Sequence, residues 1–488
     1  MKGYELSFCR EYGYPRLVER YLTEVLELID KAGVLSVILL GSTARGELSY
    51  RCDDDRLDLL SDLEMVVVTE GRPAAAEAFY HRLEAWQRER RALNPLFHVD
   101  VSFMPRRRFR RLTPLVRWFE MRSTGRVLYG ADILDEVPQV TPENLNRGQT
   151  RELVLTRLWN LLLYIPAAIV FNSWSENVTL SAAKGLPLSA AKGLPLSAAK
   201  GLPLMQPGDS SLPSVAQNDI FMLQGGPLGY DDCGEYERLI FTYVQCRNFL
   251  DVATILLPLE GVLLPGYRQR LGYVEHCFAG RSWAEYFGDC FPALLGEALI
   301  GKLDLRYSRP ALDWYRHTVE AYLGLTAYLL GNPALRQDSH ALCEQVRGEG
   351  LGFLEGRAHK WLAHELGVAL RHAGQKTAAQ WMRWLALRKR EAMVCFLFNM
   401  HFALLDLLSG VSAAQHLDRA AAELAEFALH SVAQASGLRG PSGALPYSPQ
   451  EQWLALRAAF VREMGPILRF DRRHQAYLND VIRWEYGP

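Results

Sequence analysis

The chain has 488 residues, of which 49% are hydrophobic and 22% charged, the balance of a globular protein long enough for two or three domains. Its 54 Lys and Arg residues match 55 Asp and Glu residues, so the formal net charge is −1. These totals argue against a polycation that coats nucleic acid along its whole length, although a local basic patch stays compatible with them. The eight cysteines form no CxxC pair, so neither a zinc ribbon nor a disulfide framework is indicated.

The first residues read MKGYELSFCREYGY and contain no apolar run long enough for a secretory signal. The most apolar window, from Leu153 to Phe171, is interrupted by Arg157, Asn160 and Pro166. A bilayer span needs about 20 nearly uninterrupted apolar residues. The sequence therefore predicts a cytoplasmic protein without a membrane span.

Strand and helix patterns alternate in the first third of the chain. Two segments with helical spacing of apolar residues predict helices: Leu17 to Lys31 and Arg72 to Leu93. Three short apolar runs predict buried strands: Val34 to Leu40, Leu63 to Val68 and Leu96 to Met104. The polar segment from Tyr50 to Leu60 is interpreted as an inserted loop. This alternation predicts an α/β (α+β) core with a mixed sheet over residues 1–145.

The strand patterns end near residue 145, and apolar-periodic segments typical of helices follow. They are Arg151 to Phe171, Tyr236 to Leu257, Pro310 to Leu330, Ala358 to His372, Gln380 to Ser409, Ser412 to Ala435 and Gln450 to Met464. We expect a large helical domain over 146–436, then a linker and C-terminal helices over 437–488. The octapeptide LSAAKGLP occurs three times in residues 180–203, within a segment, 176–218, that we expect to be a disordered surface loop.

A turn that could hold phosphate follows the first predicted strand. Gly41 comes directly after the strand, and a residue without a Cβ lets backbone amides approach a phosphate closely. The Ser42 hydroxyl can donate a hydrogen bond to a phosphate oxygen. On its own this pattern is weak, because a glycine and a serine are common in plain turns.

Three acidic residues strengthen the functional interpretation. Asp62 and Glu64 stand at positions i and i+2 at the start of the second predicted strand, so their side chains are expected on one face. Asp100 lies on the third predicted strand, on a face shared with His98 and Ser102. Carboxylates held side by side repel one another unless a cation lies between them. The three acids therefore predict a divalent metal site beside the turn.

Gly-Ser at a strand end, then Asp-x-Glu on a strand and a lone Asp on a later strand, resembles the DNA polymerase β-like nucleotidyltransferase superfamily. The phrase SDLEM (61–65) is similar to the metal-binding strand of kanamycin-type aminoglycoside nucleotidyltransferases, and GRVLYG (125–130) resembles the stretch that often closes the domain. The resemblance covers roughly residues 15–135. It departs from the family in the long gap between Ser42 and Asp62. The acids of that gap are rejected as metal ligands because the segment is interpreted as a loop: Asp53, Asp54, Asp55 and Asp58.

The resemblance implies a nucleotidyltransferase domain at residues 1–145 and a role for each matching residue. Gly41 and Ser42 would hold the β- and γ-phosphates of a nucleoside triphosphate, with ATP favoured. Asp62, Glu64 and Asp100 would bind two Mg²⁺ ions, or Mn²⁺, and Asp100 could take the proton of the attacking hydroxyl. Arg45 either contacts the triphosphate or is a solvated arginine.

The implied reaction moves a nucleoside monophosphate from the triphosphate to a hydroxyl acceptor and releases pyrophosphate. A small-molecule acceptor is favoured. The alternatives are transfer to a protein or an RNA end, synthesis of a nucleotide second messenger, and a catalytically idle fold that binds nucleotide as a scaffold.

For two groups of arginines, the sequence is compatible with either a structural role or a binding role. Residues 105–126 contain eight arginines and a single acid, Glu120, and could bind an anionic acceptor or form a solvated helix face. Arg238 and Arg247 lie in a predicted buried helix, where they either extend along its surface or contact the nucleotide.

Overall fold

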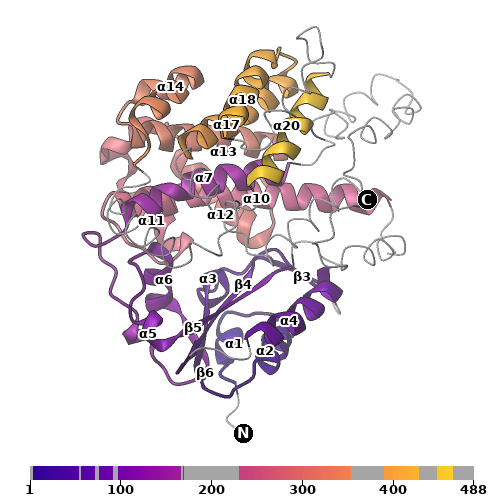
Figure 1. The fold of residues 1–488 in the computed structure, drawn as a ribbon, viewed down its shortest axis with the longest axis vertical. Coiled ribbons are helices and arrows are strands. Elements are labelled where there is room, and N and C mark those ends of the chain that lie inside the picture. Colours follow the sequence, from indigo (N-terminus) through magenta and orange to yellow (C-terminus); the bar gives the residue numbers. More distant parts are fainter. Residues whose placement is uncertain are drawn as a thin grey trace, which may run out of the picture.

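The computed structural model describes residues 4–53, 56–71, 76–91, 97–165, 169, 230–352, 390–427 and 448–464. Within these ranges, a sheet with helices on both faces occupies one end of the molecule, and a larger helical part occupies the other (Figure 1). The mixed α/β architecture predicted from the sequence is confirmed at this level. The repeat at 180–203, the helix predicted at 358–372 and most of the linker that begins at residue 437 lie outside the described residues.

The four-stranded sheet has the order β5-β4-β1-β6. The strands are β1 (Val34–Leu40), β4 (Leu63–Thr69), β5 (Val99–Pro105) and β6 (Arg126–Gly130). Strand β1 is antiparallel to both of its neighbours, and β4 is parallel to β5, so the predicted mixed sheet is confirmed. The three strands predicted from apolar runs appear within three residues of their expected bounds.

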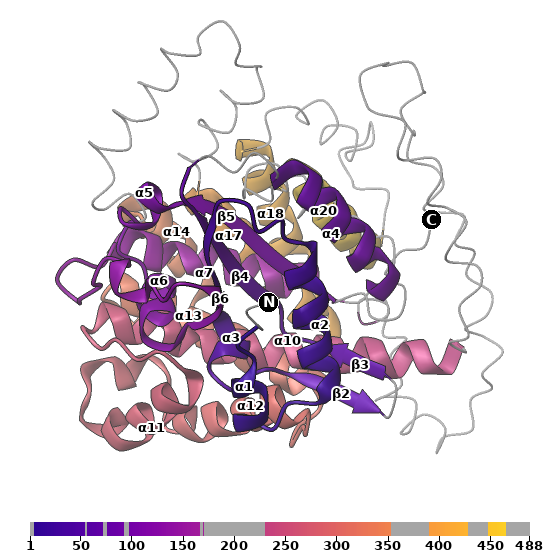
Figure 2. The same cartoon turned by 90° about the horizontal axis from the view of Figure 1, so that it is seen from below.

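Alternation along the strands divides the apolar side chains between the two faces of the sheet. One face carries Leu63, Met65 and Val67 of β4 and packs under α1 (Ser7–Glu11), α2 (Arg16–Leu28) and α4 (Ala76–Arg91). The other face carries Val66 and Val68 and packs under the helices α5 (Arg106–Phe109) and α6 (Val116–Thr124) and the short turn η1 (Leu134–Glu136). Figure 2 shows the first group of helices across the sheet from the second.

The segment interpreted as an inserted loop is a β-hairpin, which corrects the sequence-based prediction. Strands β2 (Tyr50–Asp53) and β3 (Arg56–Leu59) pair antiparallel. Leu57 and Leu59 alternate with polar residues and are buried, which supplies the period-two pattern of a strand. The buried Asp58 carboxylate pairs with Arg51 at 3.1 Å, so Asp58 has a partner within the hairpin.

Within the described residues, nine helices form the second part of the molecule. They are α7 (Arg147–Leu163), α10 (Tyr230–Leu259), α11 (Tyr267–Cys277), α12 (Phe291–Asp304), α13 (Ala311–Leu329), α14 (Ser339–Glu349), α17 (Arg390–Ser409), α18 (Ala414–Phe427) and α20 (Pro449–Met464). Short 3₁₀ turns lie between some of them: η6 (Phe278–Gly280), η7 (Ser282–Tyr286) and η8 (Pro333–Gln337). The sequence pattern did not predict α11, α12 or α14.

One hydrophobic core joins these helices from α7 to α20. Phe460 of α20 stacks on Phe396 of α17 with ring centroids 4.4 Å apart, so the last described helix is part of this core. Helix α17 is long and apolar enough to cross a membrane, and it is the one described helix that meets this test. Most of it is buried in the helical core, as in the central helix of a globular domain.

Two small apolar clusters join the sheet to the helical part. Leu60, at the end of the hairpin, packs against Ile240 and Val244 of α10. Val116 of α6 packs against Leu145, directly before α7. The end of the sheet at which β1 ends and β4 begins therefore faces α10, as Figure 1 shows. We call this end of the strands the edge.

Candidate functional site

Three chain segments meet at the edge of the sheet that faces the helical part. Strand β1 ends there at Leu40, and β4 and β5 begin there at Leu63 and Val99. The Leu63 amide donates a hydrogen bond to the His98 carbonyl at 3.1 Å, which holds the two strand starts together. Because β1 is antiparallel to β4, its carboxyl end lies beside the amino ends of the other two strands. This edge is the setting of the candidate site.

The structure brings the predicted acids to this edge. Glu64 and Asp100 are register partners in the parallel pair β4–β5, and Asp62 precedes β4 by one residue. Burial raises the pKa of Glu64, Arg117 opposes this rise, and the neighbouring carboxylates of Asp62 and Asp100 add to it. Within the described residues, no three His, Cys, Asp or Glu side chains form a group that could hold a metal ion as they stand. The acids are close enough to influence one another's charge, but they do not form a complete set of metal ligands.

Gly41 connects β1 to the short helix α3 (Gly41–Ala44) with a φ of +72°, a conformation that favours glycine. A Cβ at this position would lie 3.2 Å from Cδ of Glu64, so the glycine also makes room for that carboxylate. Next to it, the Ser42 hydroxyl makes no hydrogen bond with any described residue. The turn and Glu64 are thus close neighbours, which the sequence could suggest only through the family resemblance.

The side chain of Arg45 is buried and is held by two ion pairs. Its side chain is 8% exposed and forms ion pairs with Glu47 at 3.1 Å and with Glu120 at 2.9 Å. Despite the cost of burial, these two carboxylates raise the pKa of Arg45. The solvated-arginine alternative is therefore wrong, and the triphosphate contact of Arg45 stays a prediction beside this structural role.

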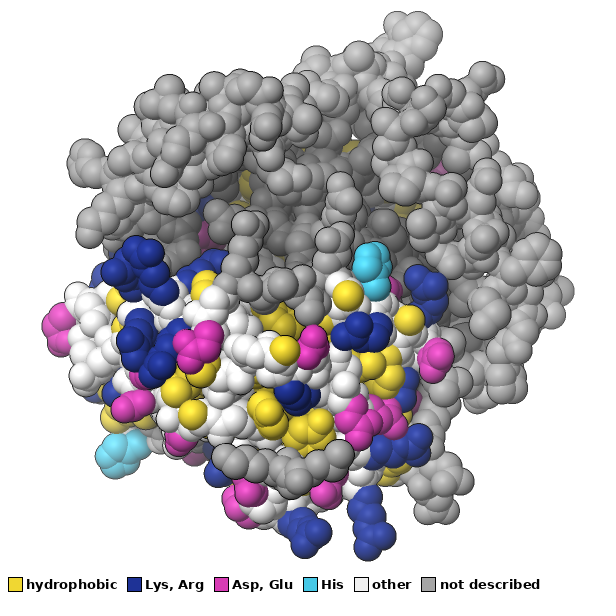
Figure 3. All heavy atoms as spheres, turned by 60° about the horizontal axis from the view of Figure 1, so that its bottom comes forward, with side chains coloured by type: hydrophobic (Ala, Val, Ile, Leu, Met, Phe, Trp, Pro, Cys, Tyr) yellow, Lys and Arg dark blue, Asp and Glu magenta, His cyan; other side chains and the backbone are white. Residues whose placement is uncertain are grey.

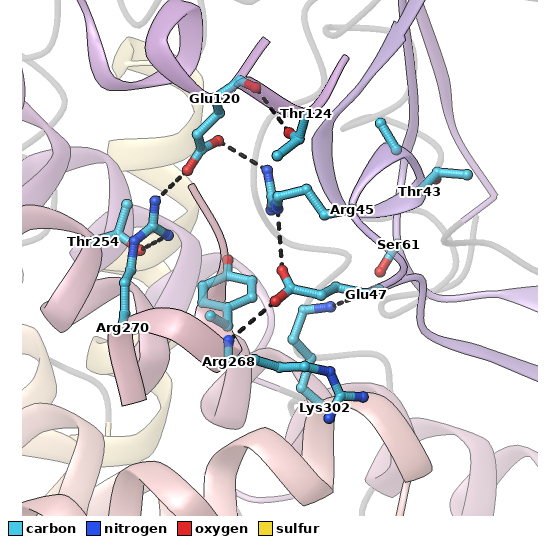
Figure 4. A network of polar contacts seen from close by, with 12 residues as sticks. Thr43, Arg45, Glu47, Ser61, Glu120, Thr124, Thr254, Arg268, Arg270 and Lys302 are labelled. Atoms are coloured by element: carbon cyan, nitrogen blue, oxygen red, sulfur yellow. Dashed lines mark hydrogen bonds and ion pairs between the residues drawn. The ribbon is translucent and has the colours of Figure 1, made fainter. Parts of the chain in front are cut away.

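A network of charged contacts extends from Arg45 into the helical part (Figure 4). Glu120 of α6 also pairs with Arg270 of α11, whose guanidinium donates to Thr254 of α10 at 2.8 Å. The Glu47 carboxylate accepts a hydrogen bond from the Arg268 amide at 3.1 Å. Through Glu120 and Glu47, the segment that follows β1 is joined to two helices of the other part.

Lys302 of α12 extends the network on the other side of Glu47. Its ammonium group donates to the Glu47 carbonyl at 2.7 Å and to the Ser49 hydroxyl at 2.9 Å. The side chain is buried, and this burial lowers the pKa of Lys302 from 10.5 to about 7, against the attraction of Glu47. A lysine thus holds the backbone between α3 and the hairpin through neutral acceptors.

Helix α10 carries a stripe of polar residues between positions 243 and 254. Tyr243, Arg247, Asp251 and Thr254 follow one another at helical spacing of three or four residues. The Tyr243 hydroxyl lies 3.1 Å from the Ser61 hydroxyl, directly before Asp62. The Asp251 carboxylate accepts a hydrogen bond from Tyr267 and pairs with Arg157, both at 2.8 Å.

Arg247 stands in the middle of this stripe and faces the acids of the sheet. Burial works against its charge, and the carboxylate of Asp62 is the strongest influence that raises the pKa of its guanidinium. Arg247 also lowers the pKa of Glu64. It has no ion pair or hydrogen bond with any described residue, so its charge acts on the acids over a distance. Both cations that influence Glu64, Arg117 and Arg247, therefore come from helices that cover the edge.

No protein-family model, no curated protein and no solved structure matches this chain.

Sequence reasoning missed most of the residues that fix the site in place. Glu47, Arg270 and Lys302 are far apart in the chain, and their partners become visible only when the sheet and the helices are packed together. One signal was available for Lys302: it is the single basic residue of the apolar helix FPALLGEALIGKLD, on a side that the helix buries. Arg247, by contrast, could be singled out from the sequence as a charged residue within a largely apolar helix.

We predict that Glu120→Gln destabilises the protein by about 3 kcal/mol, because removing one partner leaves buried charges without compensation. Arg45 and Arg270, the two partners of Glu120, are 8% and 3% exposed. The free energy of unfolding from urea titrations measures the effect.

The matched control for this variant is Asp304→Asn, which breaks the exposed ion pair with Arg306 and should cost less than about 1 kcal/mol. Equal losses in the two variants would contradict the assignment of Glu120 as the central ion-pair partner.

We predict a pH dependence of stability that originates at Lys302. Its pKa is 10.5 in the unfolded chain and about 7 in the folded protein, so between these values the unfolded chain binds the extra proton. The free energy of unfolding of the wild type should therefore rise with pH above 7, by up to about 1.4 kcal/mol per pH unit, relative to Lys302→Met. Urea titrations at pH 7, 8 and 9 give the difference. A difference that stays constant over this range would show that Lys302 remains charged in the fold.

Proposed function

We propose that this protein is a metal-dependent nucleotidyltransferase that moves a nucleoside monophosphate from a nucleoside triphosphate to a hydroxyl acceptor and releases pyrophosphate. One observation carries the proposal: the Gly41–Ser42 turn lies against Glu64, and Glu64 is the register partner of Asp100. A glycine turn that lets backbone amides approach a phosphate and a pair of adjacent carboxylates at one sheet edge are the two elements this chemistry needs.

The donor set fits magnesium. Asp62, Glu64 and Asp100 offer hard carboxylate oxygens, which Mg²⁺ and Mn²⁺ prefer. Burial is the main cause of the raised pKa of Glu64, and the carboxylates of Asp62 and Asp100 add to it. A divalent cation between these acids would offset their mutual repulsion. These three residues would hold the ions, which when bound neutralise phosphate charge and polarise the reacting phosphoryl group.

The protein's own residues would supply binding, orientation and proton transfer. Ser42 would donate its free hydroxyl to a terminal phosphate oxygen, beside the close backbone approach that Gly41 allows. Asp100 would accept the proton of the acceptor hydroxyl while the oxygen of that hydroxyl bonds to the α-phosphorus. The bond from the α-phosphorus to the bridging oxygen breaks in the same displacement, and pyrophosphate leaves. Arg117 and Arg247, whose charges already act on Glu64, would offset the negative charge of the triphosphate.

A second candidate function is a scaffold that binds nucleotide without turnover. The observation that favours it is the presence of Arg117 and Arg247, because two cations near the acids reduce the need for metal ions. Metal-dependent turnover separates the two candidates, since a scaffold releases no pyrophosphate.

We predict that Asp62→Asn, Glu64→Gln and Asp100→Asn each lower pyrophosphate release at least about a hundredfold, because each removes a charge that the transition state requires. The assay supplies Mg²⁺, each of the four nucleoside triphosphates and a mixed pool of metabolites and RNA as acceptors. Glu70→Gln, an exposed acid directly after β4, should keep wild-type activity. Removal of Mg²⁺ with a chelator should abolish release. Wild-type protein that binds nucleotide but releases no pyrophosphate would identify the scaffold instead.

A pair of glycine variants tests whether the turn positions Glu64. Gly33 and Gly41 flank β1 with φ values of +70° and +72°, but only a Cβ at residue 41 meets another group, Glu64. Both Gly33→Ala and Gly41→Ala should lose about 1 to 2 kcal/mol of stability from backbone strain. Only Gly41→Ala should also reduce kcat, by about tenfold, since the Glu64 carboxylate must shift by a few tenths of an ångström. Equal kcat values in the two variants would contradict a catalytic position for Glu64.

A further inference from the structure

Half of the arginines in residues 106–126 are already bound within the fold. Arg106 and Arg110 both pair with Glu136, at 2.9 Å and 2.8 Å from their Nε atoms, and lower its pKa to about 2. Arg122 donates to two backbone carbonyls of the segment that follows β6. Arg126 pairs with the exposed Glu11 at 3.6 Å and donates to the Tyr12 hydroxyl at 2.6 Å. These four arginines have a structural role.

The other four are exposed and form no ion pair with any described residue: Arg107, Arg108, Arg111 and Arg117. We name them the arginine strip. Glu136 already pairs with Arg106 and Arg110, so this acid does not offset the positive charge of the strip. The near-zero net charge of the whole chain conceals this local excess.

The strip leads toward the candidate site. Helices α5 and α6 cover the sheet face to which Val66 and Val68 point, and Glu64 belongs to the same face by alternation. Arg117, at the start of α6, is the strongest cationic influence on the pKa of Glu64. The other three strip residues lie beyond the far end of β5, which at about 3.3 Å per residue is about 17 Å from Asp100. Figure 3 shows this end of the molecule, where Lys and Arg side chains lie at the surface among Asp and Glu side chains.

We propose that the arginine strip binds the phosphodiester backbone of a single-stranded nucleic acid, whose terminal hydroxyl is the acceptor at Asp100; the acceptor role rests on the proposed function. Guanidinium groups present planar donors that match phosphate oxygens, and several exposed ones within a short stretch of chain fit an acceptor with several phosphates. A small uncharged acceptor would use none of the strip. This favours a nucleic-acid end over the small-molecule acceptor that the family resemblance suggests.

A membrane surface fits the strip less well than nucleic acid. Peripheral binding to lipid combines basic residues with inserted apolar ones. The large exposed hydrophobic residues of the described chain are Ile300 and Val411, and both lie in the helical part, away from α5 and α6.

The binding test uses the full-length protein and a fluorescent 12-nucleotide RNA in a series of salt concentrations. The triple variant Arg107→Gln, Arg108→Gln, Arg111→Gln should bind at least about tenfold more weakly than wild type. Its plot of log affinity against log salt should be shallower by about 2, since each phosphate contact contributes about 0.7 on single strands. The matched control neutralises three exposed arginines of α1, α2 and α4 on the opposite face: Arg10, Arg16 and Arg88. The control should stay within about threefold of wild type.

Equal losses in the two triple variants, or no RNA binding by the wild type, would overturn the proposal. Binding to anionic phospholipid vesicles but not to RNA would also overturn it, in favour of a lipid surface.

A separate arm distinguishes this proposal from the proposed function. Glu64→Gln should keep at least wild-type affinity for the RNA while it loses pyrophosphate release. If wild-type protein binds RNA through the strip but releases no pyrophosphate, the proposal of an RNA-binding surface is supported and the transferase chemistry is rejected. Wild type should extend the 12-nucleotide RNA. At subsaturating RNA, the rate of extension should fall at least about tenfold in the strip variant. This result supports both the binding surface and the transferase chemistry.

Discussion

The two carboxylates of Glu120 and Glu47 hold the sheet and the helical part in one arrangement. Each contacts groups on both sides: Glu120 pairs with Arg45 and Arg270, and Glu47 pairs with Arg45 and accepts a hydrogen bond from the Arg268 amide. Burying so many charges is favourable only when each one meets its partner at close range. The position of α10 over the sheet edge, and therefore the surroundings of Glu64, depends on these contacts.

The electrostatics of the site follow from this arrangement. The acids come from the sheet, and the cations that act on them, Arg117 and Arg247, come from helices that cover the edge. Neither cation forms an ion pair with an acid of the described residues, so positive and negative groups face one another across the site. A ligand that carries both signs, such as a metal–triphosphate complex, is complementary to such an arrangement. The same reasoning extends outward to the arginine strip, whose charge the fold leaves uncompensated.

The sequence predicted what depends on local pattern. Apolar runs located β1, β4 and β5, and the spacing of Asp62 and Glu64 indicated the edge at which acids gather. The hairpin at 50–59 was missed because its strands are short and mostly polar, so that Leu57 and Leu59 alone carry the alternation. The partners of Arg45 could not be predicted, because Glu120 and Arg270 approach it only in the tertiary fold. Long-range pairing has no signature within a single segment.

The bridging position of Glu120 also constrains how this protein can evolve. Loss of one member of a buried ion-pair group is costly, whereas replacing the whole group by well-packed apolar residues can be nearly neutral. Arg45, Glu120 and Arg270 are therefore expected to persist or be exchanged together, although they lie 75 and 150 residues apart in the chain. In a set of diverged homologues, correlated substitution at these three positions would mark the sheet–helix junction, much as an unchanging pattern of acids would mark the candidate site.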